Sequence, residues 1–323
     1  MRIVFMGTPE FAVPSLEHLV LNKYQVAAVY TQPDRAAGRG RVLVSSPVKQ
    51  LAVKLGIPVV QPDNFKNPET VAELAALKPD VIVVAAFGQI LPQPVLDIPE
   101  RGCLNVHPSL LPKFRGTSPV TAAILAGDRF TGVSIMLLDA GMDTGPILLQ
   151  AQVTISLNDT TGSLTSRLSL ISAHLLLEAL PRLASGLLFP RSQEEAGTSY
   201  TSLLNSQQGE IDWNLPAVDI WRKVRAFQPW PGCFTTWQGK QLRIIEAVSL
   251  SGETNIKPGQ VVTLDRSRAV IGVGTLEGIL GLLMVQLEGK RAMSSAEFLR
   301  GQKQLIGALL PSKLTGSNQD SSQ

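Results

Sequence analysis

The segment Cys103-Leu104-Asn105-Val106-His107-Pro108 places an amide and an imidazole two residues apart. In an extended segment, side chains at this spacing point to the same face. Pro108 favours extended backbone at His107, because a residue before proline avoids the helical region. Polar groups at the end of a buried strand lie where α/β sheets bind ligands. The alternative is a core histidine that is hydrogen-bonded to a backbone carbonyl.

A second cluster, Asp139-Ala-Gly141-Met-Asp143-Thr-Gly145-Pro, combines two acids with two glycines. This composition predicts a tight loop after the apolar run that precedes it. Glycines allow backbone groups to approach a ligand closely. If Asp143 lies beside His107, its carboxylate stabilises the imidazolium and fixes the orientation of the ring. The alternative is an ordinary turn.

The connection at residues 31–47 is long and basic. It contains Arg35, Arg39 and Arg41, and Gly38 and Gly40 flank Arg39. Its length is about three times that of a typical connection. Two interpretations fit it: a loop that contacts phosphate groups, or a solvated surface loop.

The first half of the chain alternates short apolar runs with amphipathic segments. The run Val81–Ala85 contains no polar residue, as expected of a central strand that is covered on both faces. This alternation predicts an α/β fold with a Rossmann-like, doubly wound parallel sheet. Its expected strands are 2–6, 26–30, 59–60, 81–85, 102–107 and 132–138, and its expected helices include 48–55, 69–77 and 163–187.

The pattern changes in the second half. Residues 188–210 are rich in Ser, Gln, Glu and Gly, which is typical of a linker. A helix at 217–227 is followed by short β-like runs that Gly and Pro separate, and this predicts an OB-like β-barrel. The expected organisation is an α/β domain at 1–190, a linker at 191–210, a β-barrel domain at 211–310 and a disordered tail at 311–323.

The composition, 44% hydrophobic and 17% charged, is that of an ordinary globular protein. No apolar run is long enough to cross a membrane, and the N-terminus has no secretory pattern, so we expect a cytoplasmic protein without a membrane partner. Cys103 and Cys233 have no metal-ligand spacing, and we predict no metal. The net charge of +3 arises in the C-terminal part, which permits a polyanionic partner without requiring one.

Three motifs together resemble the folate-dependent formyltransferase family. They are Asn105-Val-His107-Pro-Ser109-Leu110-Leu111-Pro112, Phe114-Arg-Gly116 and Asp139-x-Gly141-x-Asp143-Thr-Gly145. Other segments are similar to the members of this family that act on methionyl-tRNA. They are Phe5–Ala12, the loop 31–40, Ile211-Asp-Trp213 and Arg225-Ala-Phe-x-Pro-Trp-Pro231. The resemblance extends from residue 1 to about residue 305.

The resemblance implies a reaction and its participants. A formyl group moves from 10-formyltetrahydrofolate, the co-substrate, to the α-amino group of methionine on initiator methionyl-tRNA. Asn105, His107 and Asp143 are the catalytic residues that it implies. Asn105 and protonated His107 would donate hydrogen bonds to the developing oxyanion, and His107 would transfer a proton. Asp143 would orient His107 and pair with its charge. We expect a monomer.

The resemblance also implies binding residues. The folate would lie against Phe87, Gly88, Ile90, Leu91, Ser109, Leu110, Leu111, Pro112, Asp139 and Gly141. The tRNA would contact Arg35, Arg39, Arg41, Lys290 and Arg291, and the β-barrel would supply backbone contacts that tolerate sequence changes. One departure is that residues 192–210 contain no Lys or Arg, whereas this linker usually carries lysines in the family.

Three rival functions stay open at this point. The chain could be a family member that formylates an amino-sugar nucleotide, although the arginine-rich loop and the Ile211-Asp-Trp213 segment argue against this. It could be a formyltetrahydrofolate hydrolase, in which water replaces the amine. It could also be a non-catalytic RNA-binding module on a Rossmann-like scaffold.

Overall fold

The computed structural model describes residues 1–37, 42–252, 255–264 and 270–312. The chain forms two compact units. Unit 1 comprises residues 1–120, 129–155 and 163–202. Unit 2 comprises residues 121–128 and 156–162 together with the chain from residue 203 onward. Short segments of the first half therefore belong to the second unit, which the sequence pattern did not indicate.

Unit 1 contains a seven-stranded sheet in the order β10-β9-β7-β6-β1-β2-β5. The five strands from β5 to β7 are parallel, and this part confirms the predicted Rossmann-like core. Beyond β7, β9 pairs antiparallel with β7 and β10 pairs antiparallel with β9. The strands are β1 (Arg2–Gly7), β2 (Gln25–Tyr30), β5 (Val59–Val60), β6 (Val81–Ala85), β7 (Cys103–His107), β9 (Phe130–Leu137) and β10 (Ile147–Thr154).

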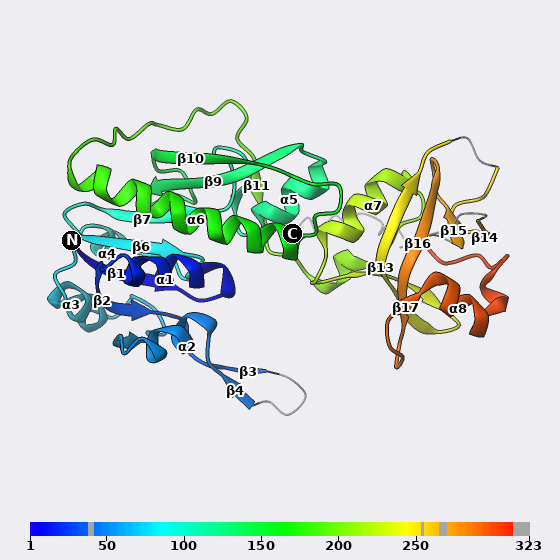
Figure 1. The fold of residues 1–323 in the computed structure, drawn as a ribbon, viewed down its shortest axis with the longest axis horizontal. Helices are drawn as coiled ribbons and strands as arrows, with labels where there is room; N and C mark the ends of the chain where they lie inside the picture. The colour runs from blue at the N-terminus through cyan, green and yellow to red at the C-terminus, as the bar shows by residue number, and fades with distance from the viewer. Residues whose placement is uncertain (38–41, 253–254, 265–269, 313–323) are drawn as a thin grey trace, which may run out of the picture. The chain divides into compact units, whose positions relative to one another are not determined.

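Helices cover both faces of this sheet, because its central strands are apolar on both sides. All five residues of β6 are buried, as predicted. On one face, Val4 and Ile82 pack in a single cluster with Leu74 of α3 and Val95 of α4. On the other face, α1 and α6 cross in front of the sheet (Figure 1). The helices of unit 1 are η1 (Glu10–Ala12), α1 (Val13–Leu21), α2 (Pro47–Lys54), α3 (Pro68–Ala76), α4 (Gln93–Leu96) and α6 (Thr161–Ala184). Most of α5 (Pro119–Ala126) belongs to unit 2.

The segment at 191–202, predicted to be linker, contributes structure to unit 1. Arg191 and Ile147 exchange two backbone hydrogen bonds of 2.9 and 2.8 Å. Strand β11 (Tyr200–Thr201) then pairs in parallel with β8 (Arg115–Gly116). Only the rest of the predicted linker, from residue 203, belongs to unit 2.

Unit 2 is built on an antiparallel sheet, as the second half of the sequence predicts. Its strand order is β12-β13-β16-β15-β14, with β17 paired to β16. Within the described residues the two end strands do not pair, so the sheet is a half-barrel. The elements are η2 (Ser206–Gly209), α7 (Ala217–Ala226), β12 (Cys233–Trp237), β13 (Lys240–Leu250), β14 (Val261–Thr263), β15 (Ile271–Gly274), β16 (Ile279–Leu287), β17 (Met293–Ser294), α8 (Ser295–Gly301) and η3 (Lys303–Leu305).

The long basic connection forms a β-hairpin. Strand β3 (Arg35–Ala37) pairs antiparallel with β4 (Val42–Val44). At its base, Lys49 Nζ lies 2.7 Å from Asp34 Oδ2 and 2.8 Å from Gln61 Oε1. The predicted contact residues Arg39 and Arg41 lie outside the described residues. Among the helices that the structure describes, none is long and apolar enough to span a bilayer.

Candidate active site

Strand β7 carries the predicted amide and imidazole. It runs parallel to β6 and antiparallel to β9, and Leu104 and Val106 are buried between its polar residues. Asn105 and His107 both approach Asp143, so the predicted shared face of the strand is confirmed. His107 is the last residue of the strand. The pair therefore lies at the carboxyl end of a buried parallel strand, where α/β sheets bind ligands.

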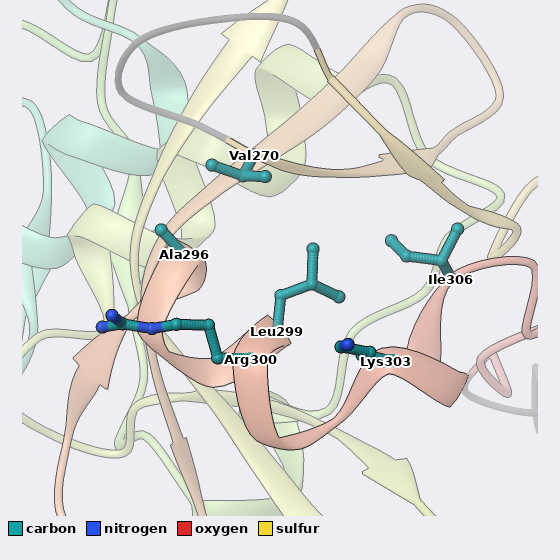
Figure 2. Close-up of a pocket in the computed structure, with 6 residues that line it drawn as sticks. All are labelled: Val270, Ala296, Leu299, Arg300, Lys303 and Ile306. Carbon is teal, nitrogen blue, oxygen red and sulfur yellow. The ribbon is translucent and has the colours of Figure 1, made fainter.

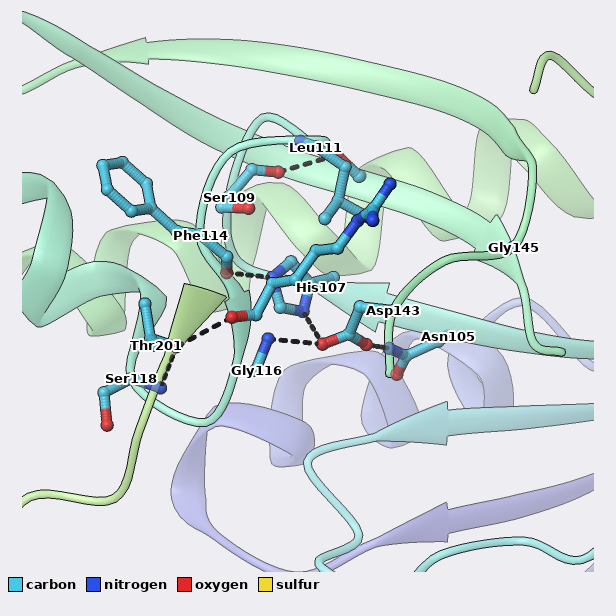
Figure 3. A network of polar contacts seen from close by, with 12 residues as sticks. Asn105, His107, Ser109, Leu111, Phe114, Gly116, Ser118, Asp143, Gly145 and Thr201 are labelled. Atoms are coloured by element: carbon cyan, nitrogen blue, oxygen red, sulfur yellow. Dashed lines mark hydrogen bonds and ion pairs between the residues drawn. The ribbon is translucent and has the colours of Figure 1, made fainter. Parts of the chain in front are cut away.

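Asp143 joins three separate parts of unit 1 (Figure 3). Its Oδ1 accepts a hydrogen bond of 3.1 Å from Asn105 Nδ2. Its Oδ2 accepts one of 2.8 Å from the backbone N–H of Gly116 and lies 3.6 Å from His107 Nδ1. A carboxylate that is fixed from both sides holds its charge in a defined place beside the imidazole. The predicted proximity of Asp143 to His107 is thus present in the structure.

Both ring nitrogens of His107 face acceptors. Nε2 lies 3.0 Å from the carbonyl oxygen of Phe114. Because a carbonyl only accepts, Nε2 carries a proton, and Nδ1 is the nitrogen that faces Asp143. The His107 side chain is 4% exposed, and this burial lowers its pKa, while the Asp143 carboxylate and the Phe114 carbonyl act in the opposite direction. Protonation of Nδ1 would convert the 3.6 Å separation from Asp143 into an ion pair.

The loop that carries Asp143 has the tight geometry that its composition predicts. The Asp139 carboxylate accepts hydrogen bonds from the Gly141 backbone, at 3.0 Å, and from Thr144 Oγ1, at 2.7 Å. Asp143 has a φ of 54°, which is unusual for a residue other than glycine. A Cβ on Gly145 would lie 1.9 Å from the Leu137 carbonyl oxygen. Backbone of the loop and of β9 therefore approach as only glycine permits.

Segment 109–112 is held by polar contacts with β9 and β10. Ser134 Oγ donates to the Ser109 carbonyl at 2.7 Å and accepts from the Leu111 backbone at 3.1 Å. Gln150 Nε2 donates to the Leu111 carbonyl at 2.9 Å. The Leu111 side chain packs in a small buried cluster with Met136. Ser109 and Leu111 are therefore buried in the scaffold, whereas Leu110 and Pro112 are partly exposed.

The other predicted folate residues divide into two groups. Phe87 and Leu91 pack in the sheet core, and they are 1% and 8% exposed. Ile90 is 89% exposed, and Gly88, Asp139 and Gly141 are also exposed. Any contact of Phe87 or Leu91 with a ligand would thus involve mainly backbone, while Ile90 offers an apolar side chain.

The described tRNA candidates are on the surface of their own units. In unit 1, the exposed Arg35 donates to the Gln32 side chain at the base of the hairpin. In unit 2, Lys290 and Arg291 are exposed, and Arg291 pairs with Glu297. Lys223 of α7 is another basic residue of unit 2, and it donates to the Glu210 carbonyl at 2.7 Å. That bond is internal to unit 2, so Lys223 is a weaker candidate than Lys290.

Two further features bear on the chemistry. Burial raises the pKa of both cysteines, Cys103 and Cys233, to about 12, so neither thiol is an activated nucleophile. Among the described side chains, no group of three or more His, Cys, Asp or Glu residues is placed to hold a metal ion.

Unit 2 contains a cavity of about 380 Å³ beside α8 (Figure 2). Among the described residues that line it there is no carboxylate or imidazole, and its polar groups are the cations of Arg300 and Lys303. The residues around it are Val270, Ala296, Leu299, Arg300, Lys303 and Ile306.

Sequence reasoning missed residues that support the three catalytic candidates. Gln193 contacts the backbone of the Asp143 loop, and Arg115 contacts Gln193. Phe114, Arg115 and Gly116 form one of the three family motifs, but their residue types alone indicate no role. Gln193 lies in a segment whose polar composition indicates a linker, so no periodic pattern distinguishes it.

Comparisons with known proteins identify the family and the fold. Residues 1–180 match the formyl transferase family model, and residues 203–303 match the model of the formyl transferase C-terminal domain. Among solved structures, the sugar 3N-formyl transferase WlaRD has a TM-score of 0.64 at 19% identity, covering 90% of this chain and 99% of that one. HypX from Aquifex aeolicus with tetrahydrofolic acid has a TM-score of 0.61 at 21% identity, covering 94% and 47%. These structures support the fold.

Sequence relatives define the family more narrowly. A methionyl-tRNA formyltransferase of Dehalococcoides mccartyi is 49% identical over 96% of this chain and 98% of that protein. One from a Roseiflexus species is 50% identical, covering 93% and 92%, and one from Marinobacter nauticus is 46% identical, covering 95% and 98%. With matches of this extent across both units, the chain belongs to the methionyl-tRNA formyltransferase family.

Proposed function

We propose that this enzyme transfers a formyl group from 10-formyltetrahydrofolate to the α-amino group of methionine on initiator methionyl-tRNA, in the cytoplasm. The observation that carries the proposal is the Asp143 carboxylate, which is bound to Asn105 and Gly116 and faces His107 at the end of β7. The full-length similarity to methionyl-tRNA formyltransferases selects the acceptor.

The exposed residues near the site suit a folate. Ile90 and Met142 expose 89% and 56% of their surface, which supplies apolar area for the faces of a pterin ring. Gly88 and Gly141 are exposed. The Gly88 carbonyl accepts from Gln32 and the Gly141 N–H donates to Asp139, so the Gly88 N–H and the Gly141 carbonyl are the groups proposed to meet the polar edge of the ring. Among the described residues, the buried Gln89 Oε1 has no hydrogen-bond donor, so it is an acceptor for a ligand N–H. Ser109, Leu110, Leu111, Pro112 and Asp139 complete the proposed folate site.

When bound, 10-formyltetrahydrofolate supplies a formyl carbon that the amine attacks, and its N10 departs with the bonding electron pair and takes up a proton. Asn105 stabilises the negative charge that develops on the formyl oxygen. Its amide nitrogen has two hydrogens, and Asp143 occupies one of them. The second is then available to the oxyanion, a contact whose loss typically costs about 10²–10³ in rate.

His107 moves the proton from the attacking amine to the departing nitrogen. Its Nε2 proton is bound to the Phe114 carbonyl, which leaves Nδ1 as the nitrogen for this exchange. The 3.6 Å separation between Nδ1 and Asp143 Oδ2 exceeds a hydrogen bond, so Nδ1 is free to bond a reacting group. Asp143 then stabilises the imidazolium that forms and keeps the ring in place.

Arg35, Lys290 and Arg291 are proposed tRNA contacts because they are exposed cations without a role in the catalytic network. Arg39 and Arg41 lie outside the described residues, and they are proposed as tRNA contacts from the sequence alone. Arg39→Ala is expected to raise KM for methionyl-tRNA and to leave folate affinity nearly unchanged, because the positive charge would contact phosphate groups. A fall in folate affinity instead would contradict this assignment of the loop.

An acceptor assay tests the proposed function. Purified enzyme is incubated with 10-formyltetrahydrofolate and either methionyl-tRNA, an amino-sugar nucleotide or no acceptor, and both formylated product and tetrahydrofolate are measured. Formylation of methionyl-tRNA alone is expected. Formylation of the sugar amine would identify the first rival, and rapid tetrahydrofolate release without an acceptor would identify a hydrolase.

A further inference from the structure

The chain after α6 returns to the catalytic edge of the sheet in unit 1. The paired backbone of Arg191 and Ile147 fixes this segment next to β10. Two residues later, Gln193 reaches the loop that carries Asp143. A segment that would only join two domains has no need of such contacts, so its course points to a role at the site.

The Gln193 amide uses its full hydrogen-bonding capacity. Nε2 donates to the Asp143 carbonyl at 2.7 Å and to the Gly145 carbonyl at 2.8 Å. Oε1 accepts from Arg115 Nε at 3.0 Å and from Arg115 Nη2 at 2.9 Å. An amide nitrogen has two hydrogens and an amide oxygen has two lone pairs, so all four are engaged. Gln193 thus connects the Asp143 loop to Arg115.

Arg115 lies between the two backbone groups that hold the catalytic side chains. The Phe114 carbonyl before it binds His107, and the Gly116 N–H after it binds Asp143. Arg115 is 3% exposed, and its other partner is the Tyr200 hydroxyl, at 3.0 Å. Burial of a cation among neutral partners is unfavourable for folding. In some proteins such a group is retained for the geometry that it imposes.

The Asp143 backbone also needs outside support. Its φ of 54° lies in the left-handed region, where a residue with a side chain is strained. A strained conformation persists only when its surroundings fix it. The bonds from Gln193 to the Asp143 and Gly145 carbonyls are contacts of this kind.

We infer that Gln193, held by Arg115, is a positioning residue that fixes the Asp143 carboxylate between Asn105, Gly116 and His107. This inference rests on the proposed formyl transfer, since it assigns a role in that reaction. Gln193 has no contact with Asn105 or His107 among those described, and it acts through the Asp143 loop. A shift of a catalytic group by about 1 Å costs up to about 100-fold in rate.

The test uses full-length enzyme, methionyl-tRNA and 10-formyltetrahydrofolate. Gln193→Glu keeps the shape of the side chain and its acceptors for Arg115, so the variant is expected to fold. It loses both donors and places a carboxylate against two carbonyls. We expect kcat to fall by about 10- to 100-fold while KM for each substrate changes little. Glu194→Gln, an exposed neighbour of the same segment, is the control and should match wild type.

A double-mutant cycle separates positioning from a general loss of structure. If Gln193 acts through Asp143, then Gln193→Glu causes little further loss in an Asp143→Asn background. Full additivity of the two losses would overturn the inference, as would wild-type kcat in Gln193→Glu. A wild-type enzyme that does not formylate methionyl-tRNA would overturn the proposed function and this inference with it. An active wild type with an unaffected Gln193→Glu would overturn the inference alone.

Discussion

The Asp143 loop and the β3–β4 hairpin are both loops beside the parallel sheet, yet they are built in opposite ways. In the Asp143 loop, polar groups bind one another, and the carboxylate is held from Asn105 and from Gly116. In the described part of the hairpin, Lys49 binds Asp34 at the base, and Arg35 is exposed. Proton transfer needs groups that are placed before the substrate arrives, whereas attraction of phosphates needs accessible charge.

The largest effects should therefore come from the groups that are fixed. His107→Ala is expected to lower kcat by about 10²–10⁴, because the proton then has no carrier. Asn105→Ala is expected to cost about 10²–10³, and Asp143→Ala should fall in the same range, since both support the developing charges. Single-turnover formylation measures the chemical step, and His174→Ala, an exposed histidine of α6, is the control. Near-normal turnover in any of the three would refute the assignment.

A substitution at Gly116 tests whether the backbone around Asp143 is as important for catalysis as the catalytic side chains. Its φ is 105°, and a Cβ there would lie 2.3 Å from the Thr201 carbonyl oxygen, so the β8–β11 pairing has no room for it. Gly116→Ala is expected to lower the free energy of unfolding by about 3 kcal/mol and to reduce kcat, because the backbone N–H at position 116 moves away from Asp143.

Gly186 offers a matched control for this steric effect. It also has a positive φ, 70°, but a Cβ there would meet nothing within 4 Å. Gly186→Ala should therefore cost only about 1 kcal/mol from backbone strain. Equal losses of stability in thermal or urea unfolding of the two variants would show that the contact with Thr201 is unimportant.

The pH dependence of stability probes the environment of His107. Burial lowers the pKa of this histidine, so the unfolded chain, with a histidine pKa of about 6.5, takes up the proton first. The contribution of neutral His107 to the free energy of unfolding is therefore complete above about pH 6.5, and it is lost as the pH falls below this value. His107→Asn should make unfolding less sensitive to acid in this range.

Asp143→Asn should make unfolding more sensitive to acid, which is the opposite of the effect expected for His107→Asn. The carboxylate raises the pKa of His107 against the effect of burial, so its removal lowers that pKa further and widens the pH range over which stability is lost. The comparison uses thermal unfolding at several pH values for wild type and both variants. An identical acid dependence in all three would mean that His107 is not buried as described.

The sequence predicted the elements whose signals are local. The all-apolar run Val81–Ala85 matches β6, and the predicted helix at 69–77 agrees with α3, which begins at Pro68 and has Asn67 as its N-cap. The placement of Asn105 and His107 on one face also followed from the period of an extended strand. Asp143 needed the resemblance, because no local rule specifies which loop a distant carboxylate will meet.

The features that the sequence missed depend on long-range contacts. Gln193 is 50 residues from Asp143 and 78 from Arg115, so its role exists only in the folded chain. The two-residue strands β8 and β11 are too short for a periodic signal. Residues 191–202 have the composition of a linker. Their contacts with the Asp143 loop and with Ile147 depend on the position of individual groups in the fold, and composition does not indicate such contacts.

The smallest effects should come from exposed cations. Replacing both Lys290 and Arg291 with alanine is expected to raise KM for methionyl-tRNA by about three- to tenfold and to reduce the salt dependence of KM by about two counterions, since each phosphate contact contributes about one. Arg291 should contribute less than Lys290, because its guanidinium already pairs with Glu297.

The same assay separates charge at a binding surface from charge in general. Lys54→Ala removes an exposed cation of α2 that has no proposed role, and its KM should match wild type at every salt concentration. KM for the folate should stay constant in all of these variants, because the cations are proposed to bind phosphate groups of the tRNA. Equal salt dependence in wild type and in the double variant would remove Lys290 and Arg291 from the tRNA surface. It would leave the assignment of the fixed catalytic groups intact, since those are tested by kcat.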